Sequence, residues 1–349
     1  MSKVLIIRFS AFGDVAMLVP VLASVAKSYP QDEFVVLTRK VFAPLFESLS
    51  ENVSTLIFDP MNDHQGFKGL MKLNKGIALM DFTHIADVHD VLRSKIIRFS
   101  LLTHPGVRVE HIDKGREEKK NLIRTKKLEV PLKSSVERYA DVFTRLGFPF
   151  ILSFQGFFDG RELPYSMLGD FVPREEKMRI GVAPFARHQG KVYPIERMEE
   201  VIQLLNSTGS VRIFLFGGKG EEEQILKTWS QKYEHVETTV GRFELKEELL
   251  LMQSLDVLVS MDSANMHLAS LVNTPVVSIW GATHPSLGFY GYGQLPENAV
   301  QIDLECRPCS VYGKKPCSRT GDEYACLKGI PPEQIVRKVM EIEKTKHVL

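Results

Sequence analysis

Short apolar runs alternate with amphipathic stretches along the first half of the chain. The apolar runs predict strands at Val4–Ile7, Phe34–Leu37, Thr55–Phe58 and Ile85–Val88. Between them, the spacing of apolar positions predicts a helix that ends at about Ser28 and amphipathic segments such as Val41–Leu49. This alternation favours a parallel sheet with helices on both faces.

The pattern repeats in the second half after an interruption. Around Asp159–Glu176 the alternation gives way to Gly, Pro and charged residues, which is typical of an interdomain linker. A second series then predicts strands at Ile180–Ala183 and Val211–Phe216, and helices at Glu196–Asn206 and Glu247–Ser254. A last helix starts at Pro331 and reaches His347, because proline favours the first turn of a helix.

The two series predict two Rossmann-like α/β domains in tandem, each with a doubly wound parallel sheet. We expect the first domain at residues 1–160, a linker at 161–176 and the second domain at 177–330. Residues 331–349 are expected to form a helix that packs back toward the N-terminal domain.

Length, composition and charge limit the classes of protein to which this chain can belong. The 349 residues are 44% hydrophobic, which is enough for two cores. Lys and Arg number 44 against 43 Asp and Glu, so the overall charge gives no indication of nucleic-acid binding. The longest apolar run, Val15–Ala26, contains Pro20 and Ser24 and is too short to span a bilayer. We therefore expect an unexported, cytoplasmic protein.

The most informative stretch is an apolar strand from Leu258 that ends in Asp262 and Ser263, followed by a helix and a second strand from Pro275 to Ile279. Ser263 is a good N-cap, so the first amides of the helix, beginning at Ala264, can point toward an anion. Such a unit makes a phosphate site at the carboxyl edge of a parallel sheet.

Three more places in the second half should lie at the same edge: the loops after the predicted strands Ile180–Ala183 and Val211–Phe216, and Gly241–Phe243 before a predicted helix. Arg187 and Lys191 would bring positive charge there, and Gly217 and Gly218 would let the backbone approach a base or ribose. Together these loops describe a nucleoside diphosphate site. In an isolated loop, each of these residues would more often be a solvated side chain or a simple turn.

Gly13 and Asp14 open the first helix directly after the first strand. Asp14 either caps that helix and favours its positive end, or serves as a general base. His267 presents a similar choice, because a histidine among apolar helical positions is more often a core residue than a catalyst.

A basic stretch marks the rest of the first half. Residues 93–127 contain eleven Lys or Arg against four Asp or Glu, a net charge of +7. The stretch is either a solvated helical surface or a surface for an anionic acceptor or anionic lipid headgroups.

All four cysteines, Cys306, Cys309, Cys317 and Cys326, fall within one late segment. Their clustering indicates one local structure: a structural zinc site, a local disulfide or reduced thiols. Neither half has a Gly-x-Gly-x-x-Gly after its first strand, which argues against a dinucleotide-dependent dehydrogenase. No Asp-x-Asp follows a strand in the right context, so catalysis is not expected to require a metal.

Taken in order along nearly the whole chain, these motifs resemble glycosyltransferase family 9, the ADP-heptose:lipopolysaccharide heptosyltransferases. The resemblance is carried by Gly13-Asp14, Asp87-x-His89-x-x-x-Arg93-Ser94, Lys191 before Pro194, Gly217-Gly218, and Asp262-Ser263-x-x-x-His267 with Pro275 and Trp280-Gly281. It implies a GT-B fold, α/β with two Rossmann-like domains facing across a cleft. It also implies inverting transfer without metal or cofactor, from a nucleotide sugar such as ADP-heptose to a lipopolysaccharide core or related glycan.

The resemblance also implies roles for individual residues. Asp14 would be the general base and Lys191 the catalytic, phosphate-binding lysine. The donor site would comprise Arg187, Lys191, Gly217, Gly218, Glu222, Asp262, Ser263, Ala264 and His267. The acceptor, an anionic glycolipid or glycan, would meet Asp87, His89, Arg93, Lys119 and Lys120, and the enzyme would touch the inner face of the cytoplasmic membrane.

Two departures from better-known members put the donor sugar in question. Ser263-Ala264 follows Asp262 where Thr-Gly is expected, and the Lys191 loop reads Arg-His-Gln-Gly-Lys. Two other functions fit the same scaffold: a nucleotide-sugar epimerase or hydrolase, and a non-catalytic nucleotide-sugar-binding protein.

Overall fold

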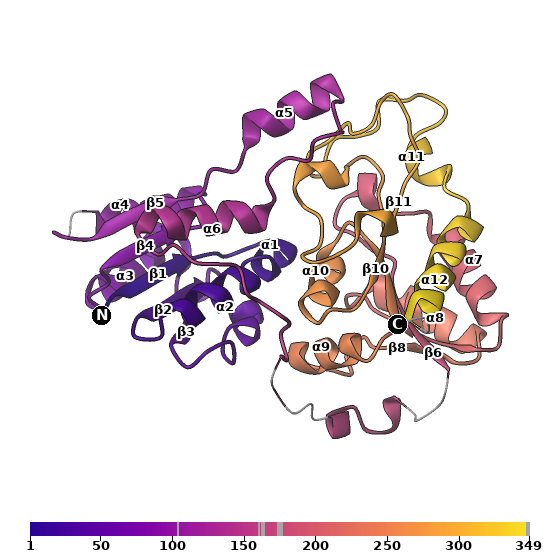
Figure 1. The fold of residues 1–349 in the computed structure, drawn as a ribbon, viewed down its shortest axis with the longest axis horizontal. Coiled ribbons are helices and arrows are strands. Elements are labelled where there is room, and N and C mark those ends of the chain that lie inside the picture. The colour runs from indigo at the N-terminus through magenta and orange to yellow at the C-terminus, as the bar shows by residue number, and fades with distance from the viewer. Residues whose placement is uncertain (103–104, 160, 162–164, 173–176, 347–349) are drawn as a thin grey trace. The chain divides into compact units, whose positions relative to one another are not determined.

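The computed structural model describes residues 1–102, 105–159, 161, 165–172 and 177–346. Seven residues of the predicted linker, 162–164 and 173–176, and the last three residues of the chain therefore lie outside the described residues. The chain forms two compact units (Figure 1). Unit 1 contains Met1–Gly115 and Lys133–Phe157, and unit 2 contains Arg116–Leu132 and Phe158–Leu349.

Unit 1 is built on a five-stranded parallel sheet in the order β3-β2-β1-β4-β5. Its strands are β1 (Lys3–Ile7), β2 (Glu33–Thr38), β3 (Val53–Ile57), β4 (His84–Asp87) and β5 (Arg108–His111). Ile7 at the end of β1 pairs with Leu37 of β2 on one side and Asp87 of β4 on the other. The loops after β1 and β4 therefore leave the sheet side by side, where the strand order reverses and such folds bind ligands.

Helices cover both faces of this sheet, as alternating inward residues require. Leu5 and Ile7 of β1 share a core with Leu73 of α3 and Ile97 of α4, while α6 contacts β4, β5 and α2 on the other face. The helices are α1 (Phe12–Ala16), α2 (Val19–Ser28), α3 (Gly66–Ala78), α4 (Leu92–Leu101) and α6 (Ser135–Leu146). The amphipathic segment at 41–49 forms only the 3₁₀ helix η1 (Lys40–Leu45), which contains Pro44.

Unit 2 repeats the plan with a six-stranded parallel sheet in the order β11-β10-β9-β6-β7-β8. Its strands are β6 (Met178–Ala183), β7 (Val211–Leu215), β8 (Val236–Thr238), β9 (Val257–Met261), β10 (Val276–Ile279) and β11 (Ala299–Val300). Ala183 of β6 pairs with Ser260 of β9, so the loops after these strands meet where the order reverses.

Two layers of helices sandwich the unit 2 sheet. One layer packs against Val182 and Val259 and comprises α7 (Ile195–Asn206), α8 (Glu221–Lys232) and α12 (Pro332–Lys346). The other layer comprises α9 (Leu245–Gln253) and α10 (Ala264–Leu271). The short helices of the chain outside unit 1 are α5 (Arg116–Thr125), η2 (Tyr165–Phe171), η3 (Gln189–Lys191), η4 (Pro285–Leu287), η5 (Pro296–Asn298) and α11 (Ala325–Lys328).

Helix α12 packs on the core of unit 2. Its buried residues Ile335 and Val339 are fully inaccessible and belong to the unit 2 core, and the helix contacts α7. Its apolar face is therefore used within unit 2, and the expectation that residues 331–349 pack back toward the N-terminal domain stays a prediction.

One segment belongs to a different unit than the sequence suggested. Residues 116–132, which include α5, are part of unit 2, although the residues on both sides of them in the sequence belong to unit 1. The Leu132 amide donates to Ser286 O (2.9 Å), and the Ser286 hydroxyl donates to Leu128 O (3.0 Å). These hydrogen bonds pair backbone groups of residues that are far apart in the sequence, so the local sequence pattern does not predict them.

The predicted α/β class with two doubly wound parallel sheets is confirmed. A search of the described residues for a helix both long enough and apolar enough to cross a bilayer finds none.

Candidate active site

An ion pair lies beside the reversal point of the unit 1 sheet. Arg8 follows β1, and Asp14 is the third residue of α1. Arg8 Nη2 lies 2.7 Å from Asp14 Oδ2, and Asp14 Oδ2 also accepts from the Ala11 amide at 3.2 Å. The Arg8 side chain is 6% exposed and that of Asp14 is 32% exposed, so the carboxylate is the accessible partner.

The Arg8 guanidinium is fixed from several sides. Its Nη1 donates to Val88 O at 2.6 Å, and it lies 5.6 Å from the centre of the Tyr139 ring. Burial lowers the pKa of Arg8. The nearby Asp14 and Tyr139 raise this pKa by more, so it lies above its ordinary value. Arg8 therefore stays charged and orients the carboxylate of Asp14.

Asp87, at the end of β4, shapes the neighbouring turn. Its side chain is fully buried and accepts from the amides of His89 (3.1 Å) and Asp90 (2.8 Å). Its other oxygen pairs with Arg98 Nη1 at 3.1 Å. These contacts give Asp87 a structural role, and its burial does not support the predicted direct contact with an acceptor.

His89 packs beneath the loop that follows β1. Its Nδ1 accepts from the Phe9 amide at 3.3 Å, and its Nε2 lies 3.5 Å from the Ser10 hydroxyl. Burial, with Arg8 and Lys114 nearby, lowers the pKa of His89 to about 3. The imidazole is therefore neutral at neutral pH and supports the loop that carries Asp14.

The remaining predicted acceptor residues belong to different units. Arg93 is exposed on α4 of unit 1, with its guanidinium 6.0 Å from the Phe58 ring centre. Lys119 is 3% exposed in unit 2, with its Nζ 4.3 Å from the Phe289 ring centre. Lys120 is exposed and pairs with Glu117 at 2.8 Å. The basic stretch 93–127 is therefore divided between the two units.

Unit 2 also has an ion pair at its reversal point. Lys191, in η3 after β6, places Nζ 2.7 Å from Oδ2 of Asp262, which follows β9. The Thr283 hydroxyl donates to the same oxygen at 2.7 Å. Asp262 is 4% exposed and Lys191 is 15% exposed, so here the cation is the more accessible partner.

Helix α10 begins directly after this pair. Ser263 is its N-cap and has extended backbone angles, and among the described residues its side chain makes no capping hydrogen bond. Its hydroxyl instead lies 3.4 Å from that of Ser260. The first amides of α10, from Ala264 onward, are consequently left uncapped beside Lys191, as an anion site requires. His267 lies further along the helix and is buried.

The loop after β7 contributes close backbone packing. A Cβ on Gly217 would meet Leu226 Cδ1 at 2.8 Å and the Phe185 ring at 3.3 Å, so a larger residue there would have to displace these side chains. The Gly218 amide donates to Glu222 Oε2 at 2.6 Å. Arg187 is exposed in the loop after β6. The structure thus brings the predicted donor residues to one edge of the unit 2 sheet.

Sequence reasoning missed two members of these clusters. The sequence pattern does not single out Arg8, although a cation directly after an apolar strand needs a partner when it is buried. Thr283 lies two residues after the Trp280-Gly281 motif, and only the structure relates it to Asp262.

Comparison with known proteins agrees with this geometry. The profile of Glycosyltransferase family 9 (heptosyltransferase) matches residues 70–318. The chain is 23% identical over 338 residues to lipooligosaccharide heptosyltransferase 2 of Campylobacter jejuni, covering 95% of this chain and 96% of the relative. It is 24% identical to lipopolysaccharide heptosyltransferase 1 of Salmonella typhimurium, covering 89% of this chain and 99% of the relative.

Solved structures share the fold. E. coli ADP-heptose lps heptosyltransferase II superposes with a TM-score of 0.70 at 17% identity, covering 99% of both chains. E. coli heptosyltransferase WaaC with ADP-2-deoxy-2-fluoro heptose gives a TM-score of 0.66 at 17% identity, covering 97% of this chain and 99% of that chain. The predicted GT-B fold is confirmed by these neighbours. The family profile covers more than half of the chain, which therefore belongs to glycosyltransferase family 9, the heptosyltransferases, and is a glycosyltransferase.

Proposed function

We propose that this enzyme transfers a heptose from ADP-heptose to a hydroxyl of an anionic lipopolysaccharide core acceptor, with inversion at the anomeric carbon. The observation that carries the proposal is the Lys191–Asp262 pair beside the uncapped start of α10. The relatives named above support heptose as the sugar, and a solved neighbour contains an ADP-heptose analogue.

On the donor side, the diphosphate would accept hydrogen bonds from Lys191 Nζ and from the first amides of α10. Lys191 now shares its charge with Asp262, and a bound diphosphate would become its second anionic partner. As the bond between the anomeric carbon and the phosphate oxygen breaks, the electron pair stays on the ADP oxygen. Well-aimed donors at that oxygen stabilise the transition state by about 2.7–4 kcal/mol each.

On the acceptor side, Asp14 would take the proton of the attacking hydroxyl while its oxygen bonds to the anomeric carbon. A single displacement of this kind inverts the anomeric configuration. The carboxylate is accessible and is oriented by Arg8, as a general base must be. General bases typically contribute about 10²–10⁴-fold to a rate. In this scheme the chain's own side chains and amides carry the charge changes, so we propose transfer without a catalytic metal.

The test is a transfer assay on purified enzyme with ADP-heptose and an acceptor lipopolysaccharide that lacks core heptose. We expect ADP release only when the acceptor is present, together with a heptosylated product. ADP release without acceptor would identify a hydrolase. A change of donor without ADP release would identify an epimerase, and nucleotide binding without either reaction would identify a binding protein.

The donor can be identified by protection against unfolding. Because a ligand that binds only the folded state stabilises it in proportion to its affinity, ADP-, GDP- and UDP-sugars can be compared directly. We expect the largest rise in the unfolding temperature with ADP-heptose. A larger rise with a GDP- or UDP-sugar would contradict the proposed donor.

We also propose that unit 1 contacts anionic headgroups of the membrane that holds the acceptor. Helices α3 and α4 contact each other and expose apolar and basic side chains together. The exposed apolar residues are Phe67, Leu79, Leu92 and Phe99, and the exposed basic residues are Lys68, Lys72, Lys75 and Arg93. Apolar insertion combined with positive charge favours binding to an anionic bilayer surface.

Vesicle sedimentation tests this contact. We expect binding to vesicles rich in phosphatidylglycerol and little binding to pure phosphatidylcholine. The variant Lys72→Glu/Lys75→Glu should weaken binding, at about 1 kcal/mol per basic residue lost, whereas the exposed unit 2 control Lys227→Glu should not. Equal binding of both variants would contradict the assignment to α3 and α4.

A further inference from the structure

A group of exposed cations adjoins the proposed donor site of unit 2, and no step of the scheme above uses them. Arg187 lies in the loop between β6 and η3, and Lys314 and Lys315 lie in the segment between β11 and α11. None of these three side chains forms an ion pair with any described residue. Together with two neighbours described below they form what we call the Lys314 surface, which comprises Arg187, His188, Tyr312, Lys314 and Lys315.

The two segments pack on each other along the side chain of Lys191. A Cβ on Gly313 would lie 2.7 Å from Lys191 Cγ and 3.2 Å from its Cε, so residue 313 follows the length of this side chain. A Cβ on Gly190 would in turn lie 2.9 Å from Gly313 O. Tyr312 and Lys314 flank Gly313 in the chain and therefore come beside the lysine that is proposed to bind the donor diphosphate.

Three positive charges act on the same imidazole. Burial lowers the pKa of His188 below its ordinary value, and Lys314, Arg187 and Lys191 lower it further. Charges that lower the same pKa lie near the same ring, so these cations from two segments share one neighbourhood. His188 is consequently neutral at neutral pH and adds no charge to the group.

Acidic residues are missing from the segments that surround these cations. Residues 184–195, 282–295 and 306–321 contact one another in unit 2, and they contain no Asp or Glu although the whole chain has 43. Other exposed lysines of unit 2 have acidic partners, since Lys227 lies 2.7 Å from Glu223 and Lys232 lies 2.7 Å from Glu199. A surface with one sign of charge attracts a ligand of the opposite sign.

Aromatic rings lie next to the cations. Tyr312 is 43% exposed, and its ring centre lies 5.6 Å from that of Phe289. Lys314 Nζ lies 5.9 Å from the centre of the Tyr312 ring. An exposed tyrosine offers a flat apolar face and a hydroxyl. The C–H face of a sugar can pack on such a ring while a charged substituent of the sugar reaches the cations.

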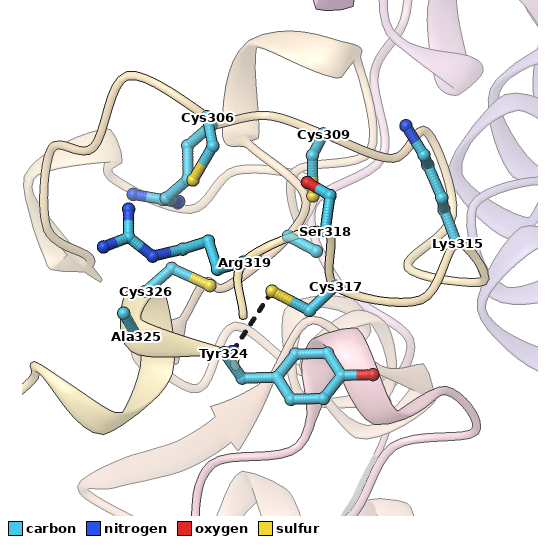
Figure 2. Close-up of a pocket in the computed structure, with 11 residues that line it drawn as sticks. Cys306, Cys309, Lys315, Cys317, Ser318, Arg319, Tyr324, Ala325 and Cys326 are labelled. Atoms are coloured by element: carbon cyan, nitrogen blue, oxygen red, sulfur yellow. Dashed lines mark hydrogen bonds between the residues drawn. The ribbon is translucent and has the colours of Figure 1, made fainter. Parts of the chain in front are cut away.

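A pocket lined by the four cysteines borders the Lys314 surface at Lys315. Figure 2 shows Lys315 at the edge of this pocket, away from Arg319, which is hydrogen-bonded to Cys306. Among the described residues the thiols form no disulfide, and no group of His, Cys, Asp or Glu side chains is placed to hold a metal ion. The pocket therefore contributes only Lys315 to the surface. Its four cysteines are Cys306, Cys309, Cys317 and Cys326.

We propose that the Lys314 surface binds a phosphate group of the acceptor glycan, while Lys191 and the start of α10 bind the donor diphosphate. This inference rests on the proposed function, because it concerns the acceptor of that reaction. A phosphate monoester carries about −1.5 to −2 charges at neutral pH and has three acceptor oxygens, so it can pair with several cations at once. The guanidinium of Arg187 can bind two of these oxygens, and Lys314 and Lys315 supply point charges.

The test compares two forms of a de-acylated acceptor oligosaccharide, one with its phosphates and one treated with phosphatase. Because neither form has acyl chains, membrane binding does not enter the measurement. We expect the wild-type enzyme to bind the phosphorylated form at least about tenfold more tightly, measured by calorimetry without donor. Equal affinity for the two forms would overturn the proposal.

Charge-reversal variants locate the phosphate site. At about 0.15 M salt, which screens distant charges, Lys314→Glu/Lys315→Glu should raise the KM for the phosphorylated acceptor about tenfold and change the Kd of ADP less than about threefold. The control Lys227→Glu/Lys232→Glu makes the same charge change on α8 and should keep the wild-type KM. An equal rise of KM in the control would overturn the assignment. A loss of ADP affinity as large as the rise of KM would also overturn it, because the two lysines would then belong to the donor site.

Binding and transfer together distinguish this inference from the proposed function. Equally fast transfer to both acceptor forms would overturn the phosphate site and leave the proposed function standing. No transfer to either form, with binding that still prefers the phosphorylated one, would overturn the proposed function and leave the phosphate site standing.

Discussion

In unit 1 the ion pair beside the central strand joins Arg8 to Asp14, and in unit 2 the equivalent pair joins Lys191 to Asp262. Both pairs lie where the order of a parallel sheet reverses, and both have N–O distances of 2.7 Å. They differ in which partner reaches the surface. Asp14 is 32% exposed over an almost buried arginine, whereas Lys191 is 15% exposed over an almost buried carboxylate.

The same sheet topology can therefore present opposite charges. In each pair the buried ion makes a further hydrogen bond: Arg8 Nη1 donates to Val88 O in unit 1, and Asp262 Oδ2 accepts from the Thr283 hydroxyl in unit 2. These bonds fix the inner ion, and the outer ion is the more exposed of the two. An outward carboxylate suits proton removal, and an outward lysine suits a phosphate.

The largest expected effect follows from removing the charge of Asp14. Asp14→Asn keeps the shape of the side chain but cannot take a proton from the acceptor. We expect the transfer rate to fall about 10²–10⁴-fold, measured as acceptor-dependent ADP release. Asp14→Glu serves as the comparison, because it keeps a carboxylate and should retain more activity. A transfer rate in Asp14→Asn equal to that of the wild type would remove Asp14 from the mechanism.

Variants of the Lys191–Asp262 pair distinguish its contribution to the stability of the protein from its contribution to transfer activity. Lys191→Ala leaves Asp262 buried without its cation, which should lower the free energy of unfolding by up to about 3–5 kcal/mol. The double variant Lys191→Ala/Asp262→Asn removes the uncompensated charge and should recover most of that loss, measured by chemical denaturation. Its transfer activity should stay low, because the phosphate-binding lysine is still absent.

Recovery of activity together with stability in the double variant would contradict a phosphate role for Lys191. It would show that the pair serves only the folding of unit 2.

Much of this architecture could be predicted from local patterns. The apolar runs at Val4–Ile7 and Ile180–Ala183 became β1 and β6, and Ser263 took the predicted N-cap position. Because the strand order is doubly wound, loops after strands were correctly expected to converge at one edge. The positions of Asp14 and Lys191 at those edges followed from the same rule.

The misses depended on contacts between distant residues. Residues 116–132 were assigned to the first domain, since nothing local shows that Lys119 packs on Phe289 or that Leu132 pairs with Ser286. The sequence shows that helix α12 has an apolar face but does not show which elements that face packs against. The prediction that Asp87 contacts an acceptor stays a prediction, and in the structure its carboxylate accepts from the amides of the turn after β4.

Acid should affect unit 1 through His89. The pKa of this histidine is about 3 in the folded protein against 6.5 ordinarily, so the unfolded chain binds more protons between these pH values. The stabilising contribution is complete above pH 6.5 and is lost as the pH falls toward 3, by about 1.4 kcal/mol per pH unit. His89→Asn, which keeps an acceptor for the Phe9 amide, should show a smaller loss between pH 6.5 and 4.

If the free energy of unfolding fell equally with decreasing pH in His89→Asn and in the wild type, His89 would not be the group that takes up a proton on unfolding. Denaturant titrations at several pH values give this comparison directly.

The smallest expected effect compares two N-caps. Ser134 of α6 accepts from the Glu137 amide at 3.1 Å, so Ser134→Ala should cost about 1 kcal/mol. Ser263 makes no such bond within the described chain, so Ser263→Ala should cost less than half of that. Denaturation curves for the two variants measure both values. Equal losses would show that Ser263 caps α10 as Ser134 caps α6.

The central claim is that unit 1 presents the base and unit 2 presents the nucleotide phosphate site. Calorimetric titration of ADP into the wild type, Asp14→Asn and Lys191→Ala/Asp262→Asn tests it most directly. We expect unchanged ADP affinity in Asp14→Asn and about 10–100-fold weaker binding in the double variant. Loss of ADP binding in Asp14→Asn, or full binding in the double variant, would contradict the claim.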